Sequence, residues 1–345
     1  MPERSIPLLA VKGLRTWFHT DQGVAKAVDD VSFEVYPGKT LAIVGESGCG
    51  KSVTAMSILG LVPTPPGAYE GGEILFEGKN LLEASAKEIQ SIRGNDISMI
   101  FQEPMTSMNP VFRVGHQIGA TLRLHRGFSK AEARAETIRL LDRVGIPAPE
   151  QRVDDYPHQM SGGMLQRIMI AMALACNPKV LIADEPTTAL DVTIQAQILA
   201  LLRTLQESSD MAIILITHDL GVVAEVADEV LVMYAGQVVE QAPVHTLFAH
   251  PAHPYTRALF KSLPGTAKAG ERLHSIQGNV PAATQFPQGC RFAPRCPHAQ
   301  PHCGEELPAT TTLSNNHHVA CWLHDEAHMA ALGLPPGFPA KELSL

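Results

Sequence analysis

Residues 45–52 read Gly-Glu-Ser-Gly-Cys-Gly-Lys-Ser, and this stretch constrains the fold more than any other part of the chain. It fits the pattern of a glycine, four residues, and then Gly-Lys-Ser/Thr. A β-rich apolar run, residues 40–44, precedes it, and residues 53–59 have the composition of a helix. The pattern is meaningful when a strand precedes the loop and a helix follows it, and both conditions are met. The stretch therefore predicts a site for the phosphates of a nucleoside triphosphate.

The same stretch predicts how the phosphates would be held. Glycines adopt backbone conformations that other residues avoid, so successive N–H groups of the loop can converge on phosphate oxygens. The N-terminus of the following helix adds partial positive charge at that point. Lys51 would reach the β- and γ-phosphates, and the Ser52 hydroxyl would ligate Mg²⁺. The residues expected to contact the nucleotide here are Gly45, Ser47, Gly48, Gly50, Lys51 and Ser52.

The size and charge of the chain limit its class. A chain of 345 residues is expected to hold roughly two domains, and its 45% hydrophobic and 18% charged residues are typical of a globular protein. The net charge of −8 does not favour nucleic acid as a partner. The sequence lacks an apolar run of about 18 residues and an N-terminal apolar signal core, so we expect a cytoplasmic protein that does not itself cross a membrane.

The hydrophobic pattern predicts an α/β fold with a mostly parallel central sheet. Residues 8–19 and 27–35 alternate apolar and polar side chains, as half-buried antiparallel strands do. Further along, apolar strands alternate with helices, which is typical of a parallel sheet. Residues 63–72 are expected to form a loop, and residues of about 103–178 a helical subdomain. The other strands are expected at 40–44, 73–77, 97–101, 179–184, 211–217, 229–234 and 237–241, and the helices at 53–59, 114–126, 129–144, 164–176, 193–208 and 220–227.

Two acidic residues follow a hydrophobic strand in residues 180–185, Val-Leu-Ile-Ala-Asp-Glu. Phosphoryl transfer needs a carboxylate near Mg²⁺ and a group that positions or deprotonates the attacking water. Asp184 suits the first role and Glu185 the second. An isolated acidic pair at a strand end often has no role, but the phosphate loop upstream favours the functional interpretation.

A second glycine-rich helix start, Ser161-Gly162-Gly163-Met164, predicts a second site for an anion. Alone it is a weak signal, because Ser-Gly-Gly is equally an ordinary helix cap and turn. In a chain with one triphosphate loop, it suggests that these residues meet the nucleotide of another subunit.

At this point the chain resembles the nucleotide-binding subunit of an ATP-binding cassette (ABC) transporter. The family's motifs occur in the family's order over about 240 residues. The resemblance implies an ABC-type P-loop NTPase core with a mostly parallel sheet, an N-terminal antiparallel β part and a helical subdomain. The matching motifs are the phosphate loop 45–52, Gln102, the signature 161–166, the acidic strand 180–185, the turn 188–191 and His218.

The resemblance also assigns roles to single residues. Gln102 would lie in a loop that touches Mg²⁺ and senses the membrane partner. His218 would contact the γ-phosphate and help to hold Glu185, the general base. The Mg²⁺ ligands would be Ser52, Gln102 and Asp184.

Three parts of the resemblance concern the rest of the nucleotide. The signature, with Ser161, Gly162 and Gly163, would close over ATP bound to the opposite subunit. Asp191, in the turn after the acidic strand, would contribute to nucleotide binding. Phe18 would stack on adenine, although Trp17 and His19 are adjacent candidates.

The sequences of residues 102–110, 183–193 and 253–256 resemble those of the dipeptide and oligopeptide importer branch of the family. This implies an ATPase at the cytoplasmic face of the cell membrane, with a homologous second ABC ATPase subunit, two transmembrane permease subunits and a periplasmic or extracellular solute-binding protein. Nickel and glutathione importers share much of this wording. A soluble ABC ATPase of DNA repair or translation, and a non-enzymatic binding module, are the other hypotheses.

Four cysteines crowd into the last part of the chain, at Cys290, Cys296, Cys303 and Cys321. Disulfides are not expected in the cytoplasm, and four thiolates in a loop-rich segment favour a metal centre. The spacing lacks the close Cys-x-x-Cys pairs of most structural zinc sites, which favours an iron–sulfur cluster. Zinc and unligated thiols remain open, and the nearby histidines at 298, 302, 317 and 318 are possible substitutes.

The importer resemblance points in the same direction. The sequence around these cysteines matches a C-terminal segment that carries a 4Fe–4S cluster in some members. We therefore expect an ABC ATPase domain over residues 1–263 and a small Cys-rich, iron–sulfur-binding region over residues 264–345. The expected cofactors are ATP, Mg²⁺ and a 4Fe–4S cluster.

Overall fold

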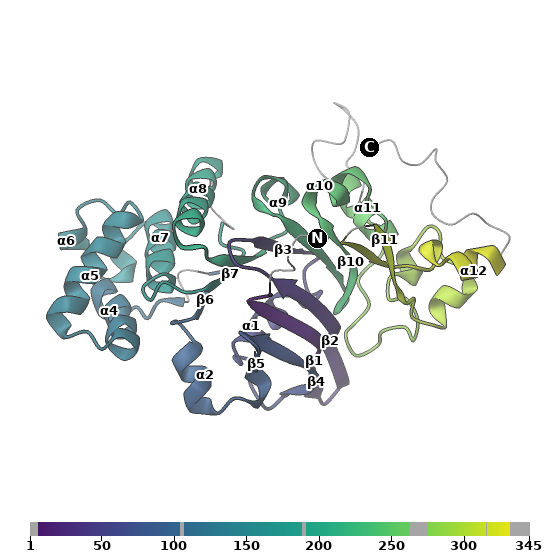
Figure 1. Ribbon diagram of the computed structural model, residues 1–345, viewed down its shortest axis with the longest axis horizontal. Coiled ribbons are helices and arrows are strands. Elements are labelled where there is room, and N and C mark those ends of the chain that lie inside the picture. Colours follow the sequence, from purple (N-terminus) through teal and green to yellow (C-terminus); the bar gives the residue numbers. More distant parts are fainter. Residues whose placement is uncertain (1–5, 104–106, 188–190, 263–274, 315, 332–345) are drawn as a thin grey trace. The chain divides into compact units, whose positions relative to one another are not determined.

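The computed structural model describes residues 6–103, 107–187, 191–262, 275–314 and 316–331 (Figure 1). The chain forms two compact units, each assembled from several segments. Unit 1 comprises Met1–Leu9, Val35–Thr40 and Phe76–Ile216, and unit 2 comprises Ala10–Glu34, Leu41–Leu75 and Thr217–Leu345. Unit 2 therefore contains both the phosphate loop and the four clustered cysteines. The expected division near residue 263 stays a prediction, because residues 263–274 lie outside the described residues.

Unit 1 is built on three parallel strands. In the sheet, β7 (Val180–Asp184) lies between β6 (Ile97–Ile100) and β8 (Ala212–Ile216). Every residue of β7 and β8 is buried, as expected for parallel strands that are covered on both faces. Strand β7 ends at Asp184, so an acidic side chain lies at the carboxyl end of a buried apolar strand.

Helices make up most of the rest of unit 1, and the teal end of Figure 1 shows a group of them packed together. Helix α5 (Lys130–Arg143) has a capping box, in which the Ser129 hydroxyl accepts from the Glu132 N–H and the Glu132 carboxylate accepts from the Ser129 N–H. This confirms the capping box expected from the sequence. The helices of unit 1 are α2 (Ala86–Ile92), α4 (Val114–Arg126), α5 (Lys130–Arg143), α6 (Pro149–Arg152), α7 (Gly162–Ala173) and α8 (Val192–Ser209).

Unit 2 contains a mixed sheet. Strand β3 (Thr40–Val44) runs parallel to β9 (Glu229–Tyr234), and β9 pairs antiparallel with β10 (Gln237–Pro243). The sheet then continues with two antiparallel strands near the C-terminus, β12 (His317–Ala320) and β11 (Thr310–Ser314). The Cys-rich region is thus joined to the β3–β9–β10 sheet through backbone hydrogen bonds.

A second sheet places β1 (Leu9–Thr20) between β2 (Gly23–Val35) and β4 (Gly67–Phe76). A two-residue turn joins β1 to β2, so these two strands run antiparallel, as expected from their alternating pattern. The short strand β5 (Lys79–Asn80) belongs to unit 1. The helices of unit 2 are α1 (Lys51–Ile58), α9 (Leu220–Val226), α10 (Val244–Ala249), α11 (Pro254–Lys261) and α12 (Glu326–Ala331).

The predicted loop over residues 63–72 is wrong in its second half, because β4 already begins at Gly67. The glycines there serve close strand approach rather than a turn. Gly72 has a φ of 91°, and a Cβ at this position would lie 2.5 Å from the carbonyl oxygen of Gly13. Several elements were not predicted from the sequence: α2, α6, α10, α11, α12, β5 and the two C-terminal strands.

Within the described residues, no helix is both long and apolar enough to span a membrane.

Candidate nucleotide site

The phosphate loop lies in unit 2, between β3 and α1. At its start, Gly45 has a φ of 152°, and a Cβ there would lie 2.2 Å from the carbonyl oxygen of Met233, so the backbone leaves no room for a side chain. Ser47 and Gly48 are exposed at the tip of the loop, and Gly50 caps α1 from a buried position. The structure thus presents the loop in the strand–loop–helix setting expected from the sequence.

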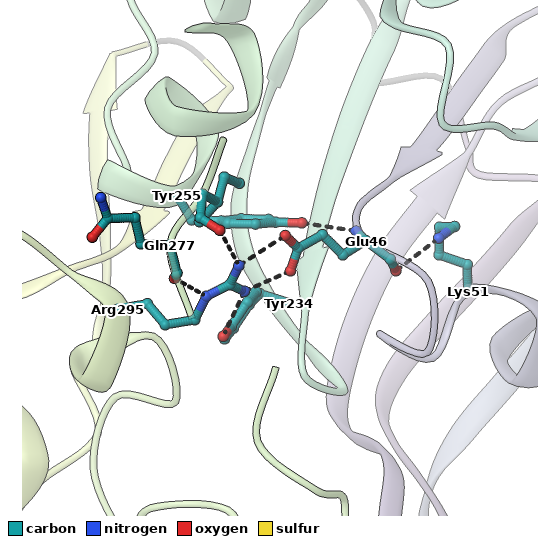
Figure 2. A network of polar contacts seen from close by, with 7 residues as sticks. Glu46, Lys51, Tyr234, Tyr255, Gln277 and Arg295 are labelled. Atoms are coloured by element: carbon teal, nitrogen blue, oxygen red, sulfur yellow. Dashed lines mark hydrogen bonds and ion pairs between the residues drawn. The ribbon is translucent and has the colours of Figure 1, made fainter. Parts of the chain in front are cut away.

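Lys51 is the first residue of α1 and is 6% exposed. Its Nζ donates to the carbonyl oxygens of Gly45 at 2.7 Å and Glu46 at 3.1 Å, so the ammonium group lies against the loop's own backbone (Figure 2). The half-buried Ser52 follows on the same helix turn. Both side chains expected to act on phosphate and Mg²⁺ therefore start from the N-terminus of one helix.

Neighbouring elements of unit 2 hold the loop from outside. The Glu46 N–H donates to the Tyr255 hydroxyl of α11 at 2.8 Å (Figure 2), and the Gly236 N–H donates to the Cys49 carbonyl at 2.9 Å. The Cys49 thiol is fully buried, and burial raises its pKa, which agrees with a structural role for this residue. This role of Tyr255 is not predictable from local sequence, because Tyr255 lies 209 residues further along the chain.

The three candidates for adenine stacking lie on β1 in different surroundings. The Trp17 Nε1–H donates to Asp29 Oδ1 at 3.3 Å, and the Lys26 ammonium lies 4.6 Å from the ring centroid. His19 pairs with Glu70 at 2.7 Å. Phe18 is half-buried and shares a strand face with Thr16, whose hydroxyl bonds to α1 at Ser57. Phe18 is therefore the candidate on the face of β1 that meets the helix after the phosphate loop.

The acidic pair lies at the end of β7 in unit 1. Asp184 is 4% exposed, and the half-buried Glu185 follows with a φ of 48°. The Gln102 amide donates to a carboxylate oxygen of Glu185 at 2.9 Å. The structure thus brings together two of the three predicted catalytic residues.

The third, His218, is an exposed residue between β8 and α9 in unit 2. Glu185 belongs to unit 1, so the interaction between His218 and Glu185 stays a prediction.

The signature residues form the start of α7. The Ser161 hydroxyl accepts from the Met164 N–H at 3.3 Å and caps the helix, while Ser161 and Gly162 are exposed and Gly163 is half-buried. One turn further, the buried Gln166 donates its amide to the Pro186 carbonyl, directly after the acidic pair. This contact fixes the signature helix against the end of β7, and the sequence analysis gave Gln166 no such role.

Asp191 has a structural role in the chain, because its Oδ1 accepts from the Ile194 N–H at 2.9 Å and caps α8. The preceding residues of the predicted turn, 188–190, lie outside the described residues. Asp191 and Ser161 are thus both helix caps in unit 1, and their contacts with nucleotide stay predictions.

The four clustered cysteines, Cys290, Cys296, Cys303 and Cys321, line one cavity in unit 2. Burial, with a smaller contribution from the neighbouring cysteines, raises the pKa of Cys321 to about 12 and that of Cys296 to about 11. In the described part of the chain, however, no three His, Cys, Asp or Glu side chains are placed to hold a metal ion.

The nearby histidines differ in their surroundings. His298 and His302 line the same cavity, and His302 Nε2 lies 3.6 Å from Cys303 Sγ. His317 pairs with the buried Glu240 at 2.8 Å, and His318 bonds to Thr312 at 3.0 Å. His317 and His318 are therefore engaged by the sheet rather than available as ligands beside the cysteines.

Comparison with known proteins agrees with these local features. Residues 28–188 match the family model described as ABC transporter, and residues 239–303 match the one described as the oligopeptide/dipeptide transporter C-terminal region. A dimeric structure of a bacterial ABC transporter cassette is similar to this chain, with a TM-score of 0.62 and 26% identity over 68% of this chain and 98% of that one.

Similarity extends over almost the whole chain among curated proteins. The dipeptide transport ATP-binding protein DppD of Bacillus subtilis is 52% identical over 92% of this chain and 95% of its own length. A probable peptide ABC transporter ATP-binding protein of Sinorhizobium fredii is also 52% identical, over 92% of this chain and 96% of its own length. This chain therefore belongs to the ATP-binding subunits of the ABC transporter family, in its oligopeptide/dipeptide branch.

Proposed function

We propose that this chain is the ATP-hydrolysing subunit of an ABC importer that powers the uptake of dipeptides or oligopeptides. The observation that carries this proposal is the C-terminal match at residues 239–303, because its description names oligopeptide and dipeptide transporters, while the description of the first match names only ABC transporters. The full-length similarity to a dipeptide transport ATP-binding protein supports it.

In the proposed reaction, the phosphate loop binds ATP, and Lys51 neutralises charge on the β- and γ-phosphates. Mg²⁺ would be held by Ser52, Gln102 and Asp184 and would offset charge on the phosphate oxygens. Glu185 accepts a proton from water as the water oxygen bonds to the γ-phosphorus and the bond to the bridging oxygen of ADP breaks. The hydrogen bond from Gln102 supports this step, because it orients the Glu185 carboxylate.

The nucleotide would be enclosed by two subunits. The phosphate loop of one subunit would be completed by Ser161, Gly162 and Gly163 of the other. Asp191 would contribute to nucleotide binding, and His218 would contact the γ-phosphate. Phe18 would stack on adenine. The exposure of Ser161 and Gly162 supports this arrangement, because a surface position leaves them accessible to a partner. We infer that the partner is a homologous second subunit.

As part of a transporter, the chain would act as a peripheral protein at the cytoplasmic face of the membrane. Its further partners would be two transmembrane permease subunits and a periplasmic or extracellular solute-binding protein. Residues 1–263 would form the ATPase domain and residues 264–345 the Cys-rich region.

We further propose that the four cysteines hold a 4Fe–4S cluster. Their common cavity supports this, because four thiols that line one enclosed space are close enough to share a cluster. In such a cluster each thiolate binds a different iron, so the four sulfur atoms need not converge on one point as they must around a single zinc ion. The cluster would have a structural or regulatory role, since ATP hydrolysis needs no electron carrier.

Reconstitution tests the transport function. The complete complex, with permeases and solute-binding protein, would be placed in lipid vesicles, and ATP hydrolysis and solute uptake would be measured with dipeptides, longer peptides, glutathione and Ni²⁺. We expect peptides to stimulate both hydrolysis and uptake. Stimulation by Ni²⁺ or glutathione and not by peptides would overturn the peptide assignment and leave the ATPase assignment intact.

A further inference from the structure

An arginine from the Cys-rich region contacts the phosphate loop. Arg295 ends a short 3-10 helix, Ala293–Arg295, and directly precedes Cys296. Its guanidinium makes a bidentate ion pair with the Glu46 carboxylate, with NH1 to Oε2 at 2.6 Å and NH2 to Oε1 at 3.1 Å (Figure 2). Glu46 is the second residue of the loop, so residues 249 apart in the chain meet at the loop's base.

The guanidinium has a partner for each of its five N–H groups. Besides the two bonds to Glu46, Nε donates to the Gln277 carbonyl at 2.9 Å, NH2 to the Ile276 carbonyl at 3.2 Å, and NH1 to the Tyr234 hydroxyl at 3.3 Å. The Arg295 side chain is 5% exposed. Its position and orientation are therefore fixed by β9, the segment at 276–277 and the loop together.

The backbone of Glu46 is held by further hydrogen bonds within the site. Its N–H donates to Tyr255, and its carbonyl oxygen accepts from Lys51 Nζ at 3.1 Å (Figure 2). The contacts thus run from Arg295 through one residue to the lysine that is expected to meet the phosphates. A change at Arg295 would act on the backbone that presents this lysine.

Charge gives the contact a second consequence. Glu46 places a carboxylate inside a loop that is proposed to bind a polyanion, and like charges at close range repel. A bidentate arginine neutralises that carboxylate and holds the Glu46 side chain in one rotamer. Without Arg295, the negative charge of Glu46 would remain beside the phosphates.

We propose that Arg295 is a positioning residue of the ATP site, which fixes Glu46 and neutralises it, so that the four-cysteine region forms part of the support of the phosphate loop. This inference rests on the proposed nucleotide function of the loop. Arg295 does not itself contact the nucleotide. It acts through Glu46.

The test compares four full-length variants: Arg295→Ala, Arg295→Lys, Glu46→Gln and the double variant Arg295→Ala/Glu46→Gln. The dissociation constant for ATP with Mg²⁺ is measured by calorimetry on each purified protein, and the midpoint of thermal unfolding is recorded alongside. We expect Arg295→Ala to weaken ATP binding about tenfold, within the usual range of coupling between sites. Arg295→Lys should fall between, because a lysine has three donors and no planar fork.

The double variant separates electrostatic positioning from mere structural support. If the unpaired carboxylate is the cause, removing its charge should restore ATP affinity to within about twofold of Glu46→Gln alone. A structural contact would give no such rescue. In the assembled complex, Arg295→Ala should raise the KM for ATP and leave kcat within about twofold, because Glu185 and Gln102 are untouched.

Arg291 supplies a comparison from the same region, because it follows Cys290 directly, is 6% exposed, and pairs with Asp29 and the Ala235 carbonyl rather than with Glu46. Arg291→Lys should lower the unfolding midpoint and change the ATP dissociation constant less than Arg295→Lys does. Equal ATP affinity of wild type and Arg295→Ala, or no rescue in the double variant, would overturn the inference. A wild-type protein that fails to bind ATP would instead overturn the nucleotide function itself.

Discussion

The phosphate loop in unit 2 and the signature in unit 1 are both glycine-rich segments at the start of a helix, but different contacts hold them in place. The loop is fastened at Glu46 by Tyr255 and Arg295, which come from distant parts of the sequence. The signature begins with Ser161, which caps its own helix and is exposed. The loop is therefore preorganised by this chain alone. The signature presents its functional edge outward, as expected for a segment that completes the site of another subunit.

The largest expected effect concerns chemistry rather than either segment. Glu185→Gln removes the proposed base and keeps the side-chain size and the hydrogen bond with Gln102. ATP turnover by the complex should fall by a factor on the order of a hundred or more. The ATP-bound pair of subunits should accumulate, which size-exclusion chromatography with ATP and Mg²⁺ would detect. Normal turnover in this variant would show that Glu185 is not the general base.

One glycine substitution in the phosphate loop and one in the signature test the difference between the two segments. Gly45→Ala places a Cβ 2.2 Å from the Met233 carbonyl at a φ of 152°, and should destabilise the protein by roughly 3 kcal/mol. Among the described residues, a Cβ at Gly162 meets no atom within 4 Å, so Gly162→Ala should keep the free energy of unfolding within about 0.5 kcal/mol.

Chemical denaturation measures both glycine variants, and ATP turnover of the assembled complex completes the test. Gly162→Ala should reduce turnover without weakening ATP binding to the isolated subunit. If Gly162→Ala unfolds the protein as readily as Gly45→Ala, the contrast between a preorganised loop and an outward-facing signature fails.

A pH titration tests the support of the loop from α11. His253 caps α11 with its Nδ1, which accepts from the Tyr255 N–H at 3.0 Å, and burial lowers the pKa of His253 to about 4. The unfolded chain has a histidine pKa near 6.5, so unfolding takes up a proton between these values. The stability contributed by neutral His253 is complete above about pH 6.5 and is lost as the pH falls towards 4.

Between pH 7 and 4.5 this group should lower the free energy of unfolding by about 2 kcal/mol. His253→Asn removes the titration and keeps a side-chain acceptor at the helix cap. The pH dependence of its unfolding free energy should therefore be shallower by that amount. An unchanged slope would mean that His253 does not remain neutral in the folded protein.

The smallest expected effect on ATP binding comes from the cysteines. Cys303→Ala should abolish the visible absorption of a bound cluster and its iron and sulfide content, while the phosphate loop stays folded. ATP affinity should fall by less than about threefold, because the pair of Arg295 with Glu46 remains. Retained iron and sulfide would exclude Cys303 as a ligand, and stoichiometric zinc in place of iron would favour the zinc alternative.

The parts of this site that the sequence predicted are those encoded locally. The strand, loop and helix around residues 40–58 and the acidic end of β7 each lie within about twenty residues, so their pattern is visible without the fold. The pairing of Arg295 with Glu46 spans 249 residues and leaves no local pattern in the sequence. Strand β11 is short, polar and mostly exposed, so its hydrophobic periodicity gives no signal. It pairs with β12, which follows it directly in the chain, and only through β12 is it joined to β10, which is distant in sequence.

The addition of β12 and β11 to the sheet has a consequence for solubility. Without them, β10 would expose a row of unpaired backbone N–H and C=O groups, which is a template for pairing with other chains. In the folded protein, β12 covers this row, with Glu240 opposite Val319, and the exposed outer strand is Thr310–Ser314, whose side chains are mostly hydroxyls. A polar, five-residue outer strand is a poor template for pairing with other chains, so the C-terminal segment should reduce edge-to-edge aggregation of the folded protein.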